Sequence, residues 1–171
     1  MSVTSTPLQL RQSAAARWIG VGVLAAVVIG LAVWHANSPS SLPTSDTPIV
    51  ASTPAGQPIF IGVFAPGDDF GRRLALSGVK VHTTSNVDLS VVPWLCVGGA
   101  IGVTSEPEQF CRELVNPEGR PLGTGDGIVL EISSEVPAIA VIDRVRLGYR
   151  EGLQWDTLEA GAPAVVSVLA R

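Results

Sequence analysis

The chain has 171 residues and a formal net charge of −4 at pH 7, and 46% of its residues are hydrophobic. Residues 59–171 carry nine basic and fourteen acidic side chains, a net charge of −5. This acidic balance argues against nucleic acid and anionic lipid as partners, because both bind cationic surfaces.

The most apolar segment of the chain, residues 18–34, contains no charged or amide side chain and has a tryptophan at each end. As a helix it would span about 25 Å, and alanines on both sides can extend it toward the ~30 Å of a hydrocarbon core. Tryptophan favours the headgroup level of a bilayer. Residues 18–36 are therefore predicted to form a transmembrane anchor helix in contact with the lipid bilayer.

The basic residues around this segment predict its orientation. Arg11 and Arg17 precede it, whereas the next Lys or Arg after it is Arg72. The positive-inside rule places a short tail, residues 1–17, in the cytoplasm and the C-terminal part outside. A cleaved signal peptide is the alternative, but the polar positions after the segment put Trp or His where a signal peptidase needs a small residue.

Small residues recur every four positions along the predicted anchor, at Gly22, Ala26 and Gly30. They would fall near one helix face and let a second helix approach closely, which is a main source of association energy in lipid. The pattern raises the hypothesis of pairing with another membrane or envelope protein. The simpler interpretation is a plain tether rich in glycine and alanine.

Residues 37–58 are rich in Pro, Ser and Thr and carry one charge, Asp46. Such a composition buries too little apolar surface to offset chain entropy, so it predicts a flexible linker. The remaining residues, 59–171, are long enough to form one domain with its own core.

Apolar and polar residues alternate with period two in this domain, which is typical of half-buried strands. The alternation is clearest in residues 79–84, 87–91, 128–133, 143–150 and 166–170. Residues 59–64 have no polar side chain and predict either a strand buried on both faces or the first strand of a sheet. Six or seven strands separated by Gly, Pro, Asn and Asp predict a mainly β fold, an antiparallel β-sandwich of immunoglobulin-like size. Residues 138–150 fit either one long strand or two strands with a bend. A capping-box spacing from Ser105 to Glu108 also predicts one short helix near residues 106–115.

Both cysteines, Cys96 and Cys111, lie in the part predicted to be outside. In an oxidising compartment an isolated pair most simply forms a structural disulfide, worth about 3 kcal/mol for a loop of this length. The spacing does not match a redox Cys-x-x-Cys, a haem or a zinc site. No cofactor or metal site is expected.

His82 is the single histidine of the predicted domain and lies on the polar face of its strand. It would be the general base of a hydrolase of the Ser-His-Asp type, but no Gly-x-Ser-x-Gly turn marks a nucleophile. The sequence therefore favours a solvated histidine and a non-catalytic role over an extracytoplasmic hydrolase centred on His82.

Two features indicate binding instead. Trp155 lies in a polar stretch, where an exposed ring can stack on a sugar or anchor a protein contact. Three arginines follow one side of a predicted strand: Arg144, Arg146 and Arg150. Cross-strand pairing with Glu131 or Glu135 is the simpler explanation for this basic row.

The order of a short tail, one anchor, a Pro/Ser linker and a Gly-, Ala- and Val-rich β domain resembles single-pass envelope proteins of bacteria with GC-rich genomes. This resemblance rests on architecture rather than on a motif, so it implies no site residues. The expected role is a membrane-anchored, extracytoplasmic module that binds a partner or supports the cell envelope. The alternatives are the hydrolase and a small accessory or sensor subunit of a membrane complex.

Overall fold

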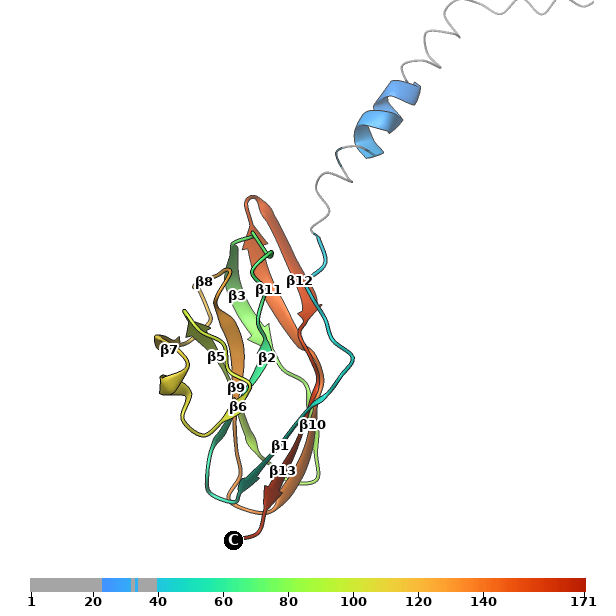
Figure 1. The fold of residues 1–171 in the computed structure, drawn as a ribbon. Helices are drawn as coiled ribbons and strands as arrows, with labels where there is room; N and C mark the ends of the chain where they lie inside the picture. Colours follow the sequence, from blue (N-terminus) through green and yellow to red (C-terminus); the bar gives the residue numbers. More distant parts are fainter. Residues whose placement is uncertain (1–22, 32, 34–39) are drawn as a thin grey trace, which may run out of the picture. The chain divides into compact units, whose positions relative to one another are not determined.

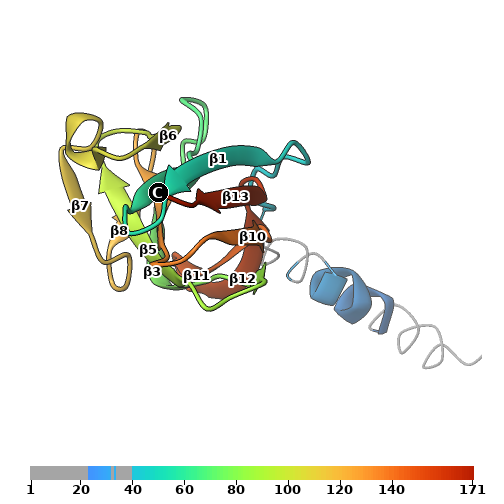
Figure 2. The ribbon, with the colours of Figure 1, turned by 90° about the horizontal axis from the view of Figure 1, so that it is seen from below.

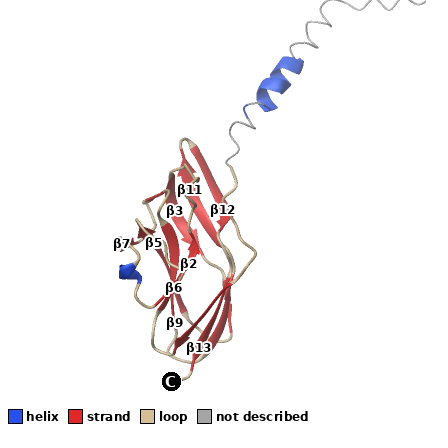
Figure 3. Ribbon diagram, in the orientation of Figure 1, coloured by secondary structure: helices blue, strands red, loops and turns tan. Residues whose placement is uncertain are grey.

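The computed structural model describes residues 23–31, 33 and 40–171. The chain forms two compact units, Met1–Ser38 and Pro39–Arg171. The second unit is built from β-strands arranged in several sheets (Figures 1 and 3), so the predicted mainly β class is confirmed.

Only part of the predicted anchor lies within the described residues. The described residues of this segment are helical, and each large hydrophobic side chain among them is more than half exposed. No helix in the described part of the chain has both the length and the apolar character needed to cross a membrane. Ala26 and Gly30 lie about one turn apart on this helix, whereas Gly22 and the predicted tail, residues 1–17, lie outside the described residues.

The strands of the second unit are β1 (Ile49–Pro54), β2 (Ile59–Phe64), β3 (Leu74–Lys80), β4 (Thr83–Ser85), β5 (Ser90–Val97), β6 (Val103–Thr104), β7 (Glu113–Val115), β8 (Pro121–Leu122), β9 (Gly127–Ser133), β10 (Ala138–Ile142), β11 (Val145–Glu151), β12 (Gln154–Ala160) and β13 (Ala164–Leu169). One five-stranded sheet has the order β6-β2-β9-β5-β7. Two four-stranded sheets have the orders β1-β13-β10-β4 and β12-β11-β3-β8. Neighbouring described strands pair antiparallel, apart from the parallel pair of β1 and β13.

Three chain segments pass from one four-stranded sheet into the other. β3 continues into β4, β10 into β11 and β12 into β13, with a bend at residues 81–82, 143–144 and 161–163. At this bend the Asp143 N–H donates to the His82 carbonyl at 3.0 Å. The segment that fitted either one strand or two is therefore two strands, β10 and β11, joined at the bend (Figure 1).

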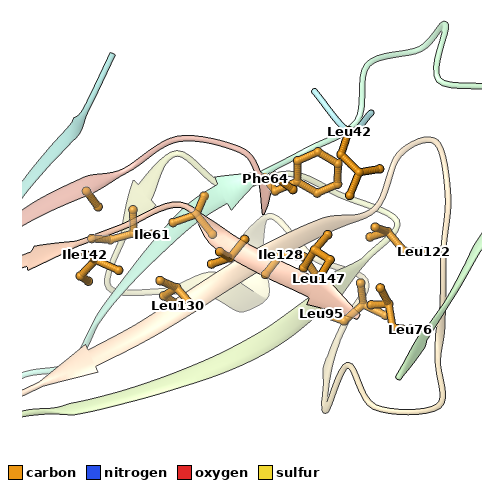
Figure 4. Packing of buried hydrophobic residues seen from close by; sticks show 14 of the residues in the cluster. Leu42, Ile61, Phe64, Leu76, Leu95, Leu122, Ile128, Leu130, Ile142 and Leu147 are labelled. Carbon is orange, nitrogen blue, oxygen red and sulfur yellow. The ribbon is translucent and has the colours of Figure 1, made fainter. Parts of the chain in front are cut away.

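The three sheets enclose one hydrophobic core, in which Ile61 of β2, Leu130 of β9 and Leu147 of β11 lie together (Figure 4). Alternate residues of β10, β11 and β13 are buried, as the period-two pattern predicts. β2 and β9 are instead buried on both faces, because a second cluster covers the outer side of their sheet. Its buried members are Phe60, Cys96, Ile101, Cys111 and Val129.

The composition predicts a flexible linker over residues 37–58, whereas the described part of this segment, residues 40–58, is ordered against the β-strands. β1 lies in this segment and pairs along its whole length with β13, which Figure 2 shows between β1 and β10. Leu42 is buried in the main core, and the Ser45 N–H donates to the Gly161 carbonyl at 2.9 Å. Backbone hydrogen bonds to distant strands thus order a segment whose own side chains bury little apolar surface.

The predicted short helix near residues 106–115 is wrong except for one 3-10 turn, η1 (Pro107–Gln109). After this turn the chain becomes extended, and β7 pairs with β5 through Cys96↔Leu114 and the neighbouring residues. The bond between Cys111 and Cys96 holds this part of the chain beside β5. The long-range pairing therefore overrides the local capping pattern, which is a weak preference by itself.

Candidate functional site

Cys96 and Cys111 form a disulfide, as the sequence predicts. The bond joins the end of β5 to the chain just before β7 and closes the loop that carries β6 and η1. Trp94 packs against the same cluster, and its Nε1–H donates to Glu131 Oε2 at 2.8 Å. Both sulfurs are buried within an apolar cluster, so the bond has the surroundings of a structural crosslink rather than of a reactive site.

The exposed His82 lines a hollow of about 440 Å³ at the bend between the two four-stranded sheets. The hollow is lined by Lys80, Val81, His82, Asp143, Arg144, Arg146 and Glu159. This lining offers carboxylates but no serine, and a Ser-His-Asp site needs both beside the imidazole. Among the described residues, the groups that the hydrolase hypothesis requires are therefore not brought together at His82.

Two of the three arginines singled out by the sequence are engaged with acidic side chains. Arg144 forms an ion pair and a hydrogen bond with Asp46, and its Nη1 lies 3.9 Å from Glu159 Oε2. Arg146 Nε lies 3.9 Å from the other oxygen of Glu159. Glu159 lies on β12 directly opposite Arg146 of β11, and Asp46 lies before β1. The pairing is therefore cross-strand for Arg146, with Glu159 in place of the predicted Glu131 or Glu135. The interpretation as a paired basic row still holds for these two arginines.

The third arginine and Trp155 lie side by side on the β11–β12 hairpin. Arg150 and Trp155 are direct cross-strand partners, and the guanidinium carbon lies 5.6 Å from the centre of the indole ring. Trp155 is 67% exposed and Leu153, in the turn, is 97% exposed. An aromatic ring, a cation and an aliphatic side chain therefore share this exposed hairpin.

Arg72 connects this hairpin to the first residues of the second unit, Pro39–Arg171, which we call the β unit. Its Nε and Nη2 donate to both carboxylate oxygens of Glu151, at 2.6–3.2 Å. Its Nη1 donates to the carbonyls of Ser40 and Ser41 at 3.2 and 3.3 Å. The guanidinium also lies over the Phe70 ring, 5.4 Å from its centre. Sequence reasoning missed this group, which we call the Arg72 clamp, because its charged partners are 79 positions apart.

The pKa values of the two charged members of the Arg72 clamp, and that of the neighbouring Tyr149, are shifted in the folded protein. The hydrogen bonds and charge of Arg72 hold the pKa of Glu151 below its usual range, and the same pairing raises the pKa of Arg72. Tyr149, next along the chain from Arg150, is 1% exposed, and no hydrogen-bond partner of its hydroxyl is found in the described structure. Burial raises the pKa of Tyr149, and the neighbouring Arg72 guanidinium, which favours the ionised hydroxyl, opposes that rise.

We expect the clamp to make stability depend on pH. Folding lowers the pKa of Glu151. Its contribution to the free energy of unfolding is therefore complete above the pKa of the unfolded state, about 4.3, and is lost as the pH falls through the lower pKa of the folded state. Glu151→Gln should thus lower the free energy of unfolding by about 1 kcal/mol at pH 7 and by progressively less toward pH 3. Urea titrations across this range measure the difference. Glu159→Gln, which removes a carboxylate with only 3.9 Å contacts, is the matched control and should stay within about 0.5 kcal/mol. A Glu151→Gln effect that is equally large at pH 3 would contradict the assignment.

A second exposed apolar surface lies on the outer face of the sheet β1-β13-β10-β4. Val50 is 72%, Ile139 60% and Val141 46% exposed, and Val141 and Val50 both pair with Val165 of β13. This surface was not predictable from the sequence, because alternation shows that a strand has two faces but not whether another layer covers the outer one.

Comparison of the chain with protein-family models, curated proteins and solved structures found no match. Among the described residues, no group of three or more His, Cys, Asp or Glu side chains is placed to hold a metal ion. The disulfide and the exposed β11–β12 hairpin are therefore the features from which a role can be argued.

Proposed function

We propose that the chain is a single-pass membrane protein that displays an extracytoplasmic β-sandwich module of the bacterial cell envelope. Residues 18–36 would be the anchor, residues 1–17 would be cytoplasmic, and the β unit would have a binding or structural role. The observation that carries the proposal is the buried disulfide between Cys96 and Cys111, in a chain that also holds a long uncharged apolar segment.

The disulfide supports an extracytoplasmic location for the β unit. Disulfides persist in oxidising compartments and are rare where thiol reductants are abundant. The apolar segment offers the means to reach such a compartment, since its described helical residues carry only apolar side chains. A helix that is apolar all round is stable in a protein core or in lipid, and lipid is the environment that this proposal assigns to it.

The exposed surfaces support binding rather than catalysis. Exposed apolar surface favours contact with a partner, and the β unit has exposed apolar side chains on the β11–β12 hairpin and on the outer face of β1 and β10. The hollow at His82 lacks a serine among its described lining residues, which leaves the hydrolase hypothesis without a nucleophile there. An accessory subunit of a membrane complex is one form that a binding role could take.

We expect protease added to intact spheroplasts to digest the β unit and to spare an N-terminal tag. The reason is the placement of basic residues, with Arg11 and Arg17 before the apolar segment and none from there to Arg72. Immunoblots against tags at each end measure the result, and spheroplasts opened with detergent are the control in which both tags disappear. Protection of the β unit would contradict the orientation, and a mature N-terminus near residue 37 would contradict the anchor.

A further inference from the structure

We infer that the tip of the β11–β12 hairpin rests in the headgroup region of the same membrane that holds the chain's own anchor. The hairpin tip is defined as residues 150–155, and the partner is the surface of a zwitterionic bilayer. The inference rests on the proposed function, because it requires residues 18–36 to lie in the bilayer.

The hairpin tip is shaped to project an apolar side chain. Gly152 has a φ of +60°, whereas the φ of Leu153 is not positive. Glycine at the first central position of a two-residue hairpin loop is the type II′ arrangement, whose backbone twist matches that of the flanking strands. Leu153 is 97% exposed at the turn, and Trp155 follows at 67%. The Arg150 guanidinium lies over the indole ring and adds a cation beside the two apolar groups.

The hairpin tip lies at the end of the β unit where the chain enters it. The Arg72 guanidinium binds the Glu151 carboxylate in the hairpin tip and also the carbonyls of Ser40 and Ser41. Leu153 is two residues from Glu151, which is at most about 7 Å along the backbone. One side chain thus holds Ser40 and Ser41 beside the hairpin tip.

The chain between the predicted anchor and this clamp is short. Three residues, 37–39, separate Ala36, the last residue of the predicted anchor, from Ser40, so the Cα atoms of Ala36 and Ser40 can lie no more than about 15 Å apart. The headgroup region on one side of a bilayer is roughly 5–8 Å thick. An anchor that ends at Ala36 therefore keeps the hairpin tip within reach of the membrane surface. Val136, in the turn before β10, lies at the opposite end of β10 and β11, up to roughly 45 Å away along these strands.

The side chains of the hairpin tip suit a zwitterionic surface. An indole ring favours the headgroup level, where its apolar body is buried and its N–H keeps a polar partner. Leu153 can enter the boundary of the acyl chains, and Arg150 can bind a lipid phosphate. The net charge of −5 over residues 59–171 opposes a strongly anionic membrane.

The test uses the full chain with Trp18→Phe and Trp34→Phe in phosphatidylcholine vesicles that contain brominated acyl chains. Trp94 and Trp155 are then the two tryptophan fluorophores of the chain. We expect the lipid to quench a component of the emission that is absent in Trp155→Phe. In the matched control, Trp155→Phe is combined with Val136→Trp, because Val136 is also exposed but lies at the other end of the strands. The control should lose no fluorescence to the brominated lipid.

A second variant tests the hairpin tip without removing the reporter. Leu153→Glu places a carboxylate at a side chain that is 97% exposed, so the fold should be kept, as circular dichroism can verify. We expect quenching of Trp155 by brominated lipid to fall, because a carboxylate resists transfer out of water.

The outcomes separate this inference from the proposed function. Flotation of the unmodified chain with vesicles at alkaline pH reports on the anchor alone, and its failure would overturn the proposed function and this inference together. Flotation without lipid quenching of Trp155 would overturn the inference alone. Protection of Trp155 from aqueous acrylamide without lipid quenching would assign the hairpin tip to a protein contact, which also overturns it.

Discussion

Replacement of both Cys96 and Cys111 with alanine is expected to lower the free energy of unfolding of the β unit by about 2–5 kcal/mol. Closure of a loop with a sequence separation of 15 accounts for about 3 kcal/mol in the chain-entropy model. The rest comes from packing, because both cysteines are buried against Phe60, Ile101 and Val129 and alanine leaves a cavity there.

Urea unfolding of the unit Pro39–Arg171, followed by tryptophan fluorescence, measures this loss. The wild-type unit in reductant is the matched control, because it keeps both sulfur atoms of Cys96 and Cys111 and loses only the covalent link. The reduced wild-type unit should lose the part of the free energy of unfolding that comes from loop closure, but not the part that comes from the cavity. Two titratable thiols in unreduced, unfolded material would contradict the crosslink, and an unfolding curve that matches the wild type would contradict its energetic role.

Patterns that depend on near neighbours predicted several strands, but not their number or all their bounds. The structure has strands up to β13 where six or seven were expected, residues 79–84 are divided between β3 and β4, and residues 87–89 precede β5. The alternation in β10, β11 and β13 is the alternation of burial in the structure, because one face of each strand lies against the core. Residues 59–64 read as a strand buried on both faces or as the first strand of a sheet, and β2 is buried on both faces. The disulfide was predictable for a different reason, since the two cysteines have no other partner of their kind.

Features that depend on distant chain were not predictable from local composition. β1 has the residues of a linker, and it forms a strand because β13, more than a hundred positions away, offers it a parallel partner. The capping spacing near residues 106–115 favours a helix by itself, yet η1 has no side-chain cap hydrogen bond, and pairing of β7 with β5 leaves room for a single turn. In both cases tertiary pairing outweighed a local preference of a few tenths of a kcal/mol per residue.

The candidate site was predictable in the same uneven way. Trp155 and Arg150 were found because an aromatic ring and a basic row in a polar stretch stand out locally. The Arg72 clamp was not found, because Arg72 and Glu151 are ordinary charged residues until the fold brings them together. Leu153 was also missed, since a single leucine in a polar stretch carries no local signal, and only the structure shows that it is 97% exposed at the turn.

Gly161→Ala is expected to destabilise the β unit by about 2–4 kcal/mol, through backbone strain and overpacking together. Gly161 has a φ of +74°, and a Cβ there would lie 1.9 Å from the Val63 carbonyl oxygen. The residue lies where the chain bends between β12 and β13 and where its N–H and carbonyl bind Pro43 and Ser45. The close approach therefore cannot relax without disturbing the start of the β unit.

Gly119→Ala is the matched control for this substitution. Gly119 has the same φ of +74°, but a Cβ there would meet nothing within 4 Å, so it carries the strain of the left-handed backbone alone, about 1 kcal/mol. Urea unfolding of the two variants of the unit Pro39–Arg171 gives the difference, which isolates the contact between Gly161 and Val63. If the two alanines lower the free energy of unfolding equally, the bend at Gly161 is not close-packed against β2. Residues 40–48 would then be held to the rest of the β unit by the Arg72 clamp, by the pairing of β1 with β13 and by the burial of Leu42.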